Sequence, residues 1–149
     1  MKEIAVNKKA YHDYEILETF EAGIKLLGSE VKSCKAGQVN LKGAYIKVAV
    51  TPTKHLAYII GMHIAPYKFA RQEGYDPLRT RELLLHKKEI LKLAGKVKEK
   101  GLSIIPLKLY QKNGLIKLEI GLCKGKKLYD KREELKKKAI KKEMKIEGF

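Results

Sequence analysis

A predicted β-hairpin around Asn113-Gly114 most constrains how this chain can fold. Apolar and polar residues alternate over Leu102–Gln111 and again over Leu115–Cys123, on either side of this dipeptide. Both central residues of a type I′ turn need a positive φ, so Asn-Gly between two alternating segments strongly predicts a tight hairpin. A cationic segment with one aromatic ring, Lys124–Arg132, follows directly. We therefore expect an apolar hairpin within a folded body and a basic tail after it.

Upstream of the hairpin, alternating residues predict one long strand and several short ones. Tyr14–Leu27 has apolar residues mainly at even positions and polar residues at most odd ones, which is typical of a half-buried strand. Gly23 within this segment predicts a bulge or bend. The short strands are expected at Ile4–Val6 on a sheet edge, Ala44–Thr51, His55–Met62 and Arg81–Leu85.

Two segments are predicted to be helices because capping residues frame them. Gly28–Gly37 is expected to form a short helix with Ser29 as its N-cap. Lys87–Lys100 carries one apolar stripe, and Glu89 follows His86 at the spacing of a capping box.

Together the predicted elements favour a mainly β fold. About six antiparallel strands, one of them long and bent, with two to three short helices suit an OB-fold-like β-barrel, which removes exposed strand edges. An open α+β sheet is the alternative. The segments Asn7–Asp13 and Ala65–Arg79 are expected to be a polar connector and a surface loop. A chain of 149 residues, 44% of them apolar, is long enough to form one domain with a core.

The net charge of +16 indicates a polyanionic partner. Residues 124–149 hold 11 Lys/Arg and 5 Asp/Glu, and the rest of the positive excess lies upstream. We therefore divide the chain into an RNA-binding body, residues 1–123, and a basic C-terminal tail, residues 124–149. Nucleic acid is the leading candidate. A membrane surface ranks second and is not expected, because the tail lacks the Trp-, Phe- and Leu-rich face of an interfacial helix.

Catalytic and metal-binding patterns are sparse. His12-Asp13, with Glu15 and Glu18 nearby, is the one acid–base cluster, and a solvated strand edge is favoured over a metal-dependent nuclease site. Cys34 and Cys123 belong to no CxxC pair and are expected to be buried thiols in a reducing cytoplasm. No enzyme activity, no cofactor, no metal and no signal peptide are expected.

RNA-binding chemistry is better supplied than catalytic chemistry. Lysines attract phosphates without sequence preference, and tyrosines between them offer rings for base stacking, although most of these rings are expected to pack within the fold. Tyr129, flanked by lysines in the tail, is the strongest stacking candidate. A general single-stranded RNA-binding or ribosomal protein with the same barrel is an alternative.

Short strings along nearly the whole chain match one known family in order and spacing. They are Asn7–Ala10, His12–Tyr14, Phe20–Ile24, Gly28–Ser33, Ala36-Gly37, Asp76–Arg79, Leu83–Lys87, Gly95–Gly101, Pro106–Tyr110, Gly125–Lys127 and Asp130–Arg132. Together they resemble the SmpB family, the proteins that bind transfer-messenger RNA (tmRNA) in bacterial trans-translation. So many matching strings argue against chance.

The resemblance implies an OB-fold barrel that binds the tRNA-like domain of tmRNA and delivers it to a stalled 70S ribosome whose message lacks a stop codon. It implies that the body replaces the missing anticodon arm. The tail would enter the decoding centre, formed by small-subunit RNA, and the mRNA channel as a helix. Alanyl-tRNA synthetase and elongation factor Tu would be indirect partners through tmRNA. We expect a cytoplasmic monomer.

The resemblance also implies two groups of functional residues. Glu30 is expected to accept a hydrogen bond from a base amino or 2′-hydroxyl group, with support of the helix dipole as its alternative role. The full RNA-binding set is Asn7, Lys8, Lys9, His12, Glu30, Lys32, Lys35, Asn40, Lys124, Lys126 and Lys127. The set expected at the ribosome is Tyr129, Asp130, Lys131, Arg132, Lys136, Lys137 and Lys138. Many family members carry His at the position of Tyr129; the change keeps a stacking ring and removes the imidazole charge.

Overall fold

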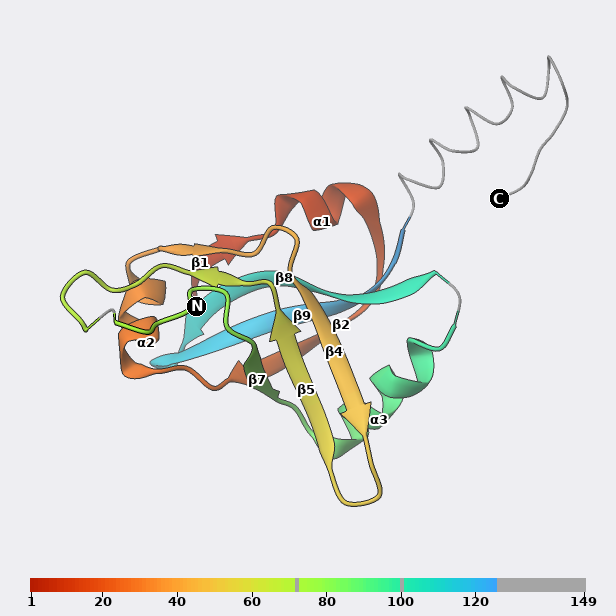
Figure 1. Ribbon diagram of the computed structural model, residues 1–149. Coiled ribbons are helices and arrows are strands. Elements are labelled where there is room, and N and C mark those ends of the chain that lie inside the picture. The colour runs from red at the N-terminus through yellow and green to blue at the C-terminus, as the bar shows by residue number, and fades with distance from the viewer. Residues whose placement is uncertain (72, 100, 126–149) are drawn as a thin grey trace, which may run out of the picture.

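An open antiparallel sheet is the main layer of the computed structural model, which describes residues 1–71, 73–99 and 101–125 (Figure 1). Seven strands lie in the order β1-β8-β9-β2-β7-β5-β4, and a second sheet pairs β3 with β6. The strands are β1 (Lys2–Val6), β2 (Tyr14–Ile24), β3 (Val39–Asn40), β4 (Tyr45–Val50), β5 (His55–Ile60), β6 (His63–Ile64), β7 (Arg81–Leu84), β8 (Leu102–Lys112) and β9 (Leu115–Gly125). The helices are α1 (Lys8–Asp13), α2 (Gly28–Lys35) and α3 (Lys87–Lys96).

The β8–β9 hairpin forms where the sequence predicts it, and both of its strands lie inside the seven-stranded sheet. Asn113 and Gly114 both have positive φ, 52° and 78°, which the Asn-Gly turn requires. β9 pairs with β8 on one side and with β2 on the other, so it is a central strand. It continues to Gly125, two residues past the predicted end at Cys123.

The predicted closed barrel is wrong for the residues that the structure describes. Their ladder ends at β1 on one edge and at β4 on the other, and no hydrogen-bonded pairing joins these two strands. The sheet curls until β4 lies beside β8 without joining its ladder. The chain therefore has the open mainly β sheet with three short helices, which is closer to the alternative fold of the sequence analysis.

In two of the long strands, β2 and β8, bulges change which face of the sheet the side chains occupy, and simple alternation does not predict this change. In β2 the register shifts between Ile16 and Glu18, so the bulge lies at Leu17 and not at Gly23. In β8 the register shifts around Leu107. One extra residue reverses the side-chain phase. The early part of β2 thus packs beneath α1, whereas Phe20 and later residues face the main core.

Gly23 has a different role from the predicted bend. It lies where β2 passes from pairing with β9 to pairing with β7. A Cβ atom at this position would meet the Leu84 Cβ at 3.2 Å. Glycine therefore allows the two strands to approach closely.

The helices agree with the sequence only in part. α1 was expected to be a connector, but Asn7 caps it and turns Lys8–Asp13 into a helix. The predicted N-cap Ser29 is wrong: Leu27 is the N-cap, so α2 begins at Gly28, two residues earlier than a Ser29 cap would give. α3 starts after His86, whose N–H donates to the Glu89 carboxylate at 3.0 Å, as the capping-box spacing predicts.

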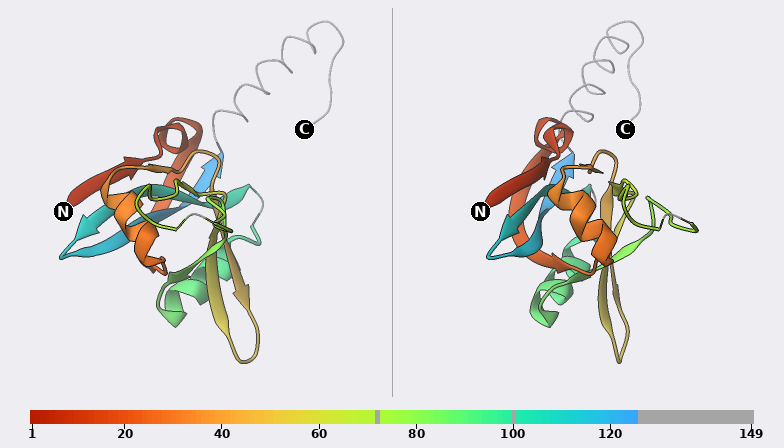
Figure 2. Two further views of the ribbon diagram at one scale, coloured as in Figure 1. Left: turned by 60° about the vertical axis from the view of Figure 1, so that its left-hand side comes forward. Right: turned by 90° about the vertical axis from the view of Figure 1, so that its left-hand side faces the viewer.

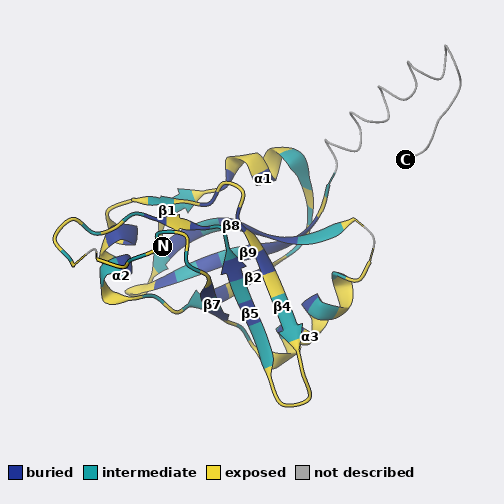
Figure 3. Ribbon diagram, viewed as in Figure 1, coloured by how far each residue is buried: buried dark blue, intermediate teal, exposed yellow. Residues whose placement is uncertain are grey.

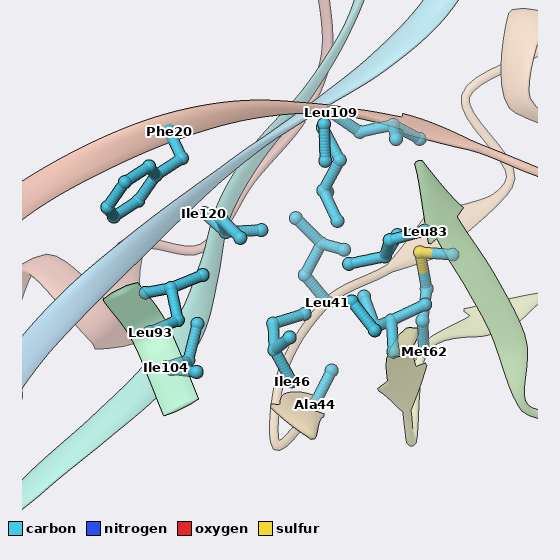
Figure 4. Close-up of a cluster of buried hydrophobic side chains, with 14 of the residues drawn as sticks. Phe20, Leu41, Ala44, Ile46, Met62, Leu83, Leu93, Ile104, Leu109 and Ile120 are labelled. Atoms are coloured by element: carbon cyan, nitrogen blue, oxygen red, sulfur yellow. The ribbon is translucent and has the colours of Figure 1, made fainter. Parts of the chain in front are cut away.

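Two apolar clusters stabilise the fold. The main cluster lies between the curled sheet, α2 and α3, and Figure 4 shows the side chains of Phe20, Ile120 and Met62 directed into it. The smaller cluster, beneath α1, contains Ala10 and Leu107. Figure 3 shows that buried residues follow the sheet, whereas the loops and the outer faces of the helices are exposed. Within the described ranges no helix is both long and apolar enough to span a membrane.

Candidate nucleic-acid interface

Asn7 fixes the start of α1 against β8. Its Nδ2 donates to the Pro106 carbonyl oxygen at 2.8 Å, and its Oδ1 accepts from the Ala10 N–H at 3.2 Å. Its own N–H donates to the Leu107 carbonyl oxygen at 2.8 Å. Asn7 is buried, so its polar groups are bonded within the protein. It is thus placed to act on a ligand through the position of α1 rather than by direct contact.

Replacing Asn7 with alanine is expected to destabilise the protein by about 2 kcal/mol, because α1 loses its cap and the buried Pro106 carbonyl loses its partner. Urea unfolding measures this change. Asn40→Ala is the matched control, because Asn40 is exposed and its Oδ1 accepts one local bond, from the Lys42 N–H at 2.9 Å. The control should lose less than about 1 kcal/mol. Equal losses in the two variants would contradict the anchoring role.

The structure gathers four predicted RNA-binding residues at one end of the sheet. α1 leads into Tyr14, which pairs with Gly125 at the end of β9. This pairing brings together residues from near both ends of the described chain. The four residues are Lys8, Lys9 and His12, all exposed on α1, and Lys124, exposed on β9.

The Asp13 carboxylate partly offsets the positive charge around α1. Its carboxylate lies 3.8 Å from the Lys9 Nζ and 2.9 Å from the His12 Nδ1. The acid–base pair predicted from the sequence therefore exists as a contact. Among the described residues, however, no group of three or more His, Cys, Asp or Glu is arranged to hold a metal ion.

A second group of predicted residues lies on α2 and β3. Lys32 and Lys35 are exposed on α2, and Asn40 is exposed on β3. Lys126, Lys127 and the whole tail set lie outside the described residues.

Glu30, on the same helix, is the centre of a buried ionic network. Only 1% of the residue is exposed. Its Oε1 accepts from the Arg79 Nη2 at 2.5 Å and from the Leu27 N–H at 2.8 Å. Its Oε2 accepts from the Tyr75 hydroxyl at 2.9 Å and from the Arg81 Nε at 2.8 Å. Since a carboxylate offers about four lone-pair sites, protein donors fill its accepting capacity.

Arg81 extends this network to the backbone. Its side chain is fully buried, its Nη1 donates to the Met62 carbonyl oxygen at 2.8 Å, and its Nη2 donates to the Pro77 carbonyl oxygen at 3.1 Å. The network thus ties α2 to both ends of the long loop between β6 and β7. Glu30 is placed to shape this surface, and its carboxylate does not face solvent, unlike the direct RNA contact expected from the sequence.

The same network makes the folding stability of the protein depend on pH in the acid range. Burial favours the neutral form of Glu30, but hydrogen bonds from Arg79, Arg81 and the Leu27 N–H outweigh it and lower the pKa from 4.5 to about 2. Because the folded-state pKa is depressed, the stabilisation is complete above pH 4.5 and is lost as the pH falls through 2.

Between about pH 5 and about pH 2, protonation of Glu30 is expected to remove about 3 kcal/mol of stability. Thermal unfolding at a series of pH values measures the loss. Glu30→Gln is the matched comparison, because it cannot titrate while the other carboxylates remain. The variant should start less stable and show a shallower acid dependence than the parent; parallel curves would contradict the assigned pKa.

Two clefts are features that the sequence analysis missed. One, of about 260 Å³, lies between β2, β7 and the β8–β9 turn, and the exposed Leu84 and Leu115 line it with Lys117. The other, of about 590 Å³, lies between α1, β4 and β8, with Lys9 and Tyr45 among its lining residues. The run Leu83-Leu84-Leu85 carries no alternation, so the sequence does not show which leucine is exposed.

Comparisons with known proteins give this surface a context. A family model described as SmpB protein matches residues 4–147. An SsrA-binding protein of Persephonella marina is 54% identical over 97% of this chain and 92% of its own length. Another, from a Sulfurihydrogenibium species, is 56% identical over 96% and 91%.

A solved structure supports the same assignment. It is described as "tmRNA-SmpB: a journey to the center of the bacterial ribosome", and it aligns with a TM-score of 0.69 at 47% identity. The alignment covers 91% of this chain and 93% of that one. With sequence, length and fold in agreement, the chain belongs to the SmpB protein family.

Proposed function

We propose that this chain binds tmRNA and carries it to stalled ribosomes in trans-translation. The observation that carries the proposal is the identity of more than half of the residues, over nearly full length, to proteins named for binding SsrA RNA. The solved relative described with tmRNA and the ribosome supports the second partner. The role is one of recognition and delivery in the cytoplasm, without catalysis by the protein.

The body, residues 1–123, is proposed to grip the tRNA-like domain of tmRNA. The basic residues around α1 and Lys124 supply phosphate attraction at one end of the sheet, and Lys32, Lys35 and Asn40 supply a second contact region. Asn7 and Glu30 hold these regions in place from inside the protein. Two fixed regions recognise a folded RNA by its shape, which charge alone does not.

The tail, residues 124–149, is proposed to serve the ribosome. Tyr129 and the Asp130–Arg132 motif would contact the decoding centre, and Lys136, Lys137 and Lys138 would follow the mRNA channel. Lys126 and Lys127 lie between the two regions and would contact tmRNA. Elongation factor Tu and alanyl-tRNA synthetase would meet this protein only through the RNA.

A competition gel shift tests the binding half of the proposal. Labelled tmRNA is bound to the full chain and competed with bulk tRNA, at two salt concentrations. The complex should survive a large excess of tRNA, and raising the salt should weaken it because released counterions drive part of the binding. Equal competition by bulk tRNA would favour a general RNA-binding protein and overturn the proposal.

A further inference from the structure

Two aromatic rings, flanked by a lysine at each end, lie beside α2, and the rings have no part in the two contact regions proposed above. The Tyr67 and Phe69 rings meet edge to face, with centroids 5.6 Å apart. The Lys32 Nζ lies 5.6 Å from the centre of the Tyr67 ring, and the Lys68 Nζ lies 4.9 Å from the centre of the Phe69 ring. We call these four residues the aromatic ladder.

The chain that carries the ladder is fastened to α2 at its start. The Ser33 Oγ donates to the Ala65 carbonyl oxygen at 2.7 Å, and the Ala65 N–H donates to the Gln38 carbonyl oxygen at 3.0 Å. Ser33 is itself buried. On the return side of the loop, Arg81 holds the Pro77 carbonyl. Hydrogen bonds therefore anchor the segment on both sides of the aromatic ladder, at Ala65 and at Pro77, and limit how the rings can be oriented.

Phe69 is the open end of the ladder. It is 76% exposed, which is the highest value after Met1 among the large hydrophobic residues that the structure describes. The neighbouring Arg71 is also exposed. In Figures 1 and 2 this segment projects past α2, away from α1 and from the end of β9. The exposed ring thus has the Lys68 ammonium group beside it and lies apart from the basic residues of α1.

This chemistry fits an unpaired nucleotide. A nucleobase stacks on an aromatic face whatever its sequence, and cations beside the ring attract the adjoining phosphates. A protein partner with an apolar pocket would not need the flanking lysines, and a duplex would hide its base faces from Phe69.

We propose that Phe69 stacks on an unpaired base of the bound RNA, with Lys32 and Lys68 beside its phosphates. The inference rests on the proposed function, because the RNA is the tmRNA assigned above. It adds a stacking contact at a second place on that RNA, separate from the residues around α1. Phe69 makes the contact, and Tyr67 supports its ring from the side.

The absence of tryptophan from the sequence allows a direct test. Phe69→Trp places a single indole at the proposed contact, and stacking on a base is expected to quench its fluorescence during titration with tmRNA. Val50→Trp is the matched control, because Val50 is also exposed and ends β4, on the hairpin that projects at the bottom of Figure 1, away from the segment that carries Phe69. Its emission should stay unchanged.

Affinity measurements complete the test. Phe69→Leu keeps an apolar side chain without a π face, and it should weaken tmRNA binding about tenfold, since stacking on one base is worth about 1–3 kcal/mol. Its salt dependence should match that of the parent, whereas Lys68→Gln should reduce the salt slope by about one contact. Val50→Ala should bind as tightly as the parent.

Two outcomes separate this inference from the proposal beneath it. If tmRNA saturates Phe69→Trp in a gel shift while its fluorescence is unchanged, the stacking contact is disproved and tmRNA binding stands. If the unmodified chain shows no preference for tmRNA, the proposed function itself fails.

Discussion

Replacing Glu30 with alanine is expected to cost about 3–5 kcal/mol of folding stability, a large share of what a single domain has. The reason is that Arg81 would stay fully buried without its counter-charge, and Arg79 would lose two hydrogen bonds. Removing one member of a buried ion pair costs far more than the pair contributes as a whole, because the remaining charge has left water without compensation. Urea unfolding followed by circular dichroism measures the loss.

Glu73→Ala provides the matched control for this experiment. Glu73 also pairs with an arginine, Arg71, at 3.8 Å, but the two side chains are 85% and 89% exposed. Exposed pairs are screened by water, so this change should stay within about 0.5 kcal/mol. A loss below about 1 kcal/mol for Glu30→Ala would show that Arg81 finds other partners and that the network is not required.

Loss of the Glu30 network should also weaken the binding of tmRNA. The Glu30 network holds both sides of the loop between β6 and β7, and α2 carries Lys32 and Lys35. Variants that remain folded but lose this network, such as Glu30→Gln, should bind tmRNA more weakly even though Glu30 is buried. An exposed Glu30 would be expected to contact the RNA directly, whereas we expect the buried Glu30 to act by holding α2 and the loop in position.

Local signals explain which parts of the fold could be predicted from the sequence. The β8–β9 hairpin depends on two adjacent residues with positive φ, and the dipeptide Asn113-Gly114 predicts such a turn. The start of α3 depends on a hydrogen bond between two residues three positions apart, from the His86 N–H to the Glu89 carboxylate. Both features are encoded within a few residues, so patterns in the sequence are sufficient to find them.

Distant contacts explain what could not be predicted. The partners of Glu30 lie 45, 49 and 51 residues away, at Tyr75, Arg79 and Arg81. No pattern around Glu30 distinguishes a buried ion-pair partner from a helix N-terminal charge. In the same way, Asn7 caps α1 through the nearby Ala10 N–H, but its Nδ2 also donates to the Pro106 carbonyl oxygen, 99 residues away, and this bond anchors the cap to β8. The bulges in β2 and β8 reverse a periodicity that the sequence shows as continuous.

Removing residues 130–149 is expected to leave tmRNA binding nearly intact and to abolish ribosome rescue. These residues hold eight basic and five acidic side chains, so they contribute only +3 of the net charge of +16. The basic residues of α1, α2 and β9 all remain. Affinity for tmRNA should therefore change by less than about threefold at moderate salt, and the salt slope, which counts phosphate contacts, should be almost unchanged.

The matched variant reverses this pattern. Lys8→Gln combined with Lys9→Gln removes two charges from α1 and keeps the tail, so it should weaken tmRNA binding and lower the salt slope by about two contacts. Once enough protein is supplied to saturate the RNA, this variant should again tag stalled peptides in a reconstituted translation reaction. The truncated chain should fail in that reaction at any concentration, because its defect comes after RNA binding. If truncation instead cost most of the tmRNA affinity, the tail would belong to the tmRNA-binding surface. The proposed separation of tmRNA binding by the body from ribosome binding by the tail would then be wrong.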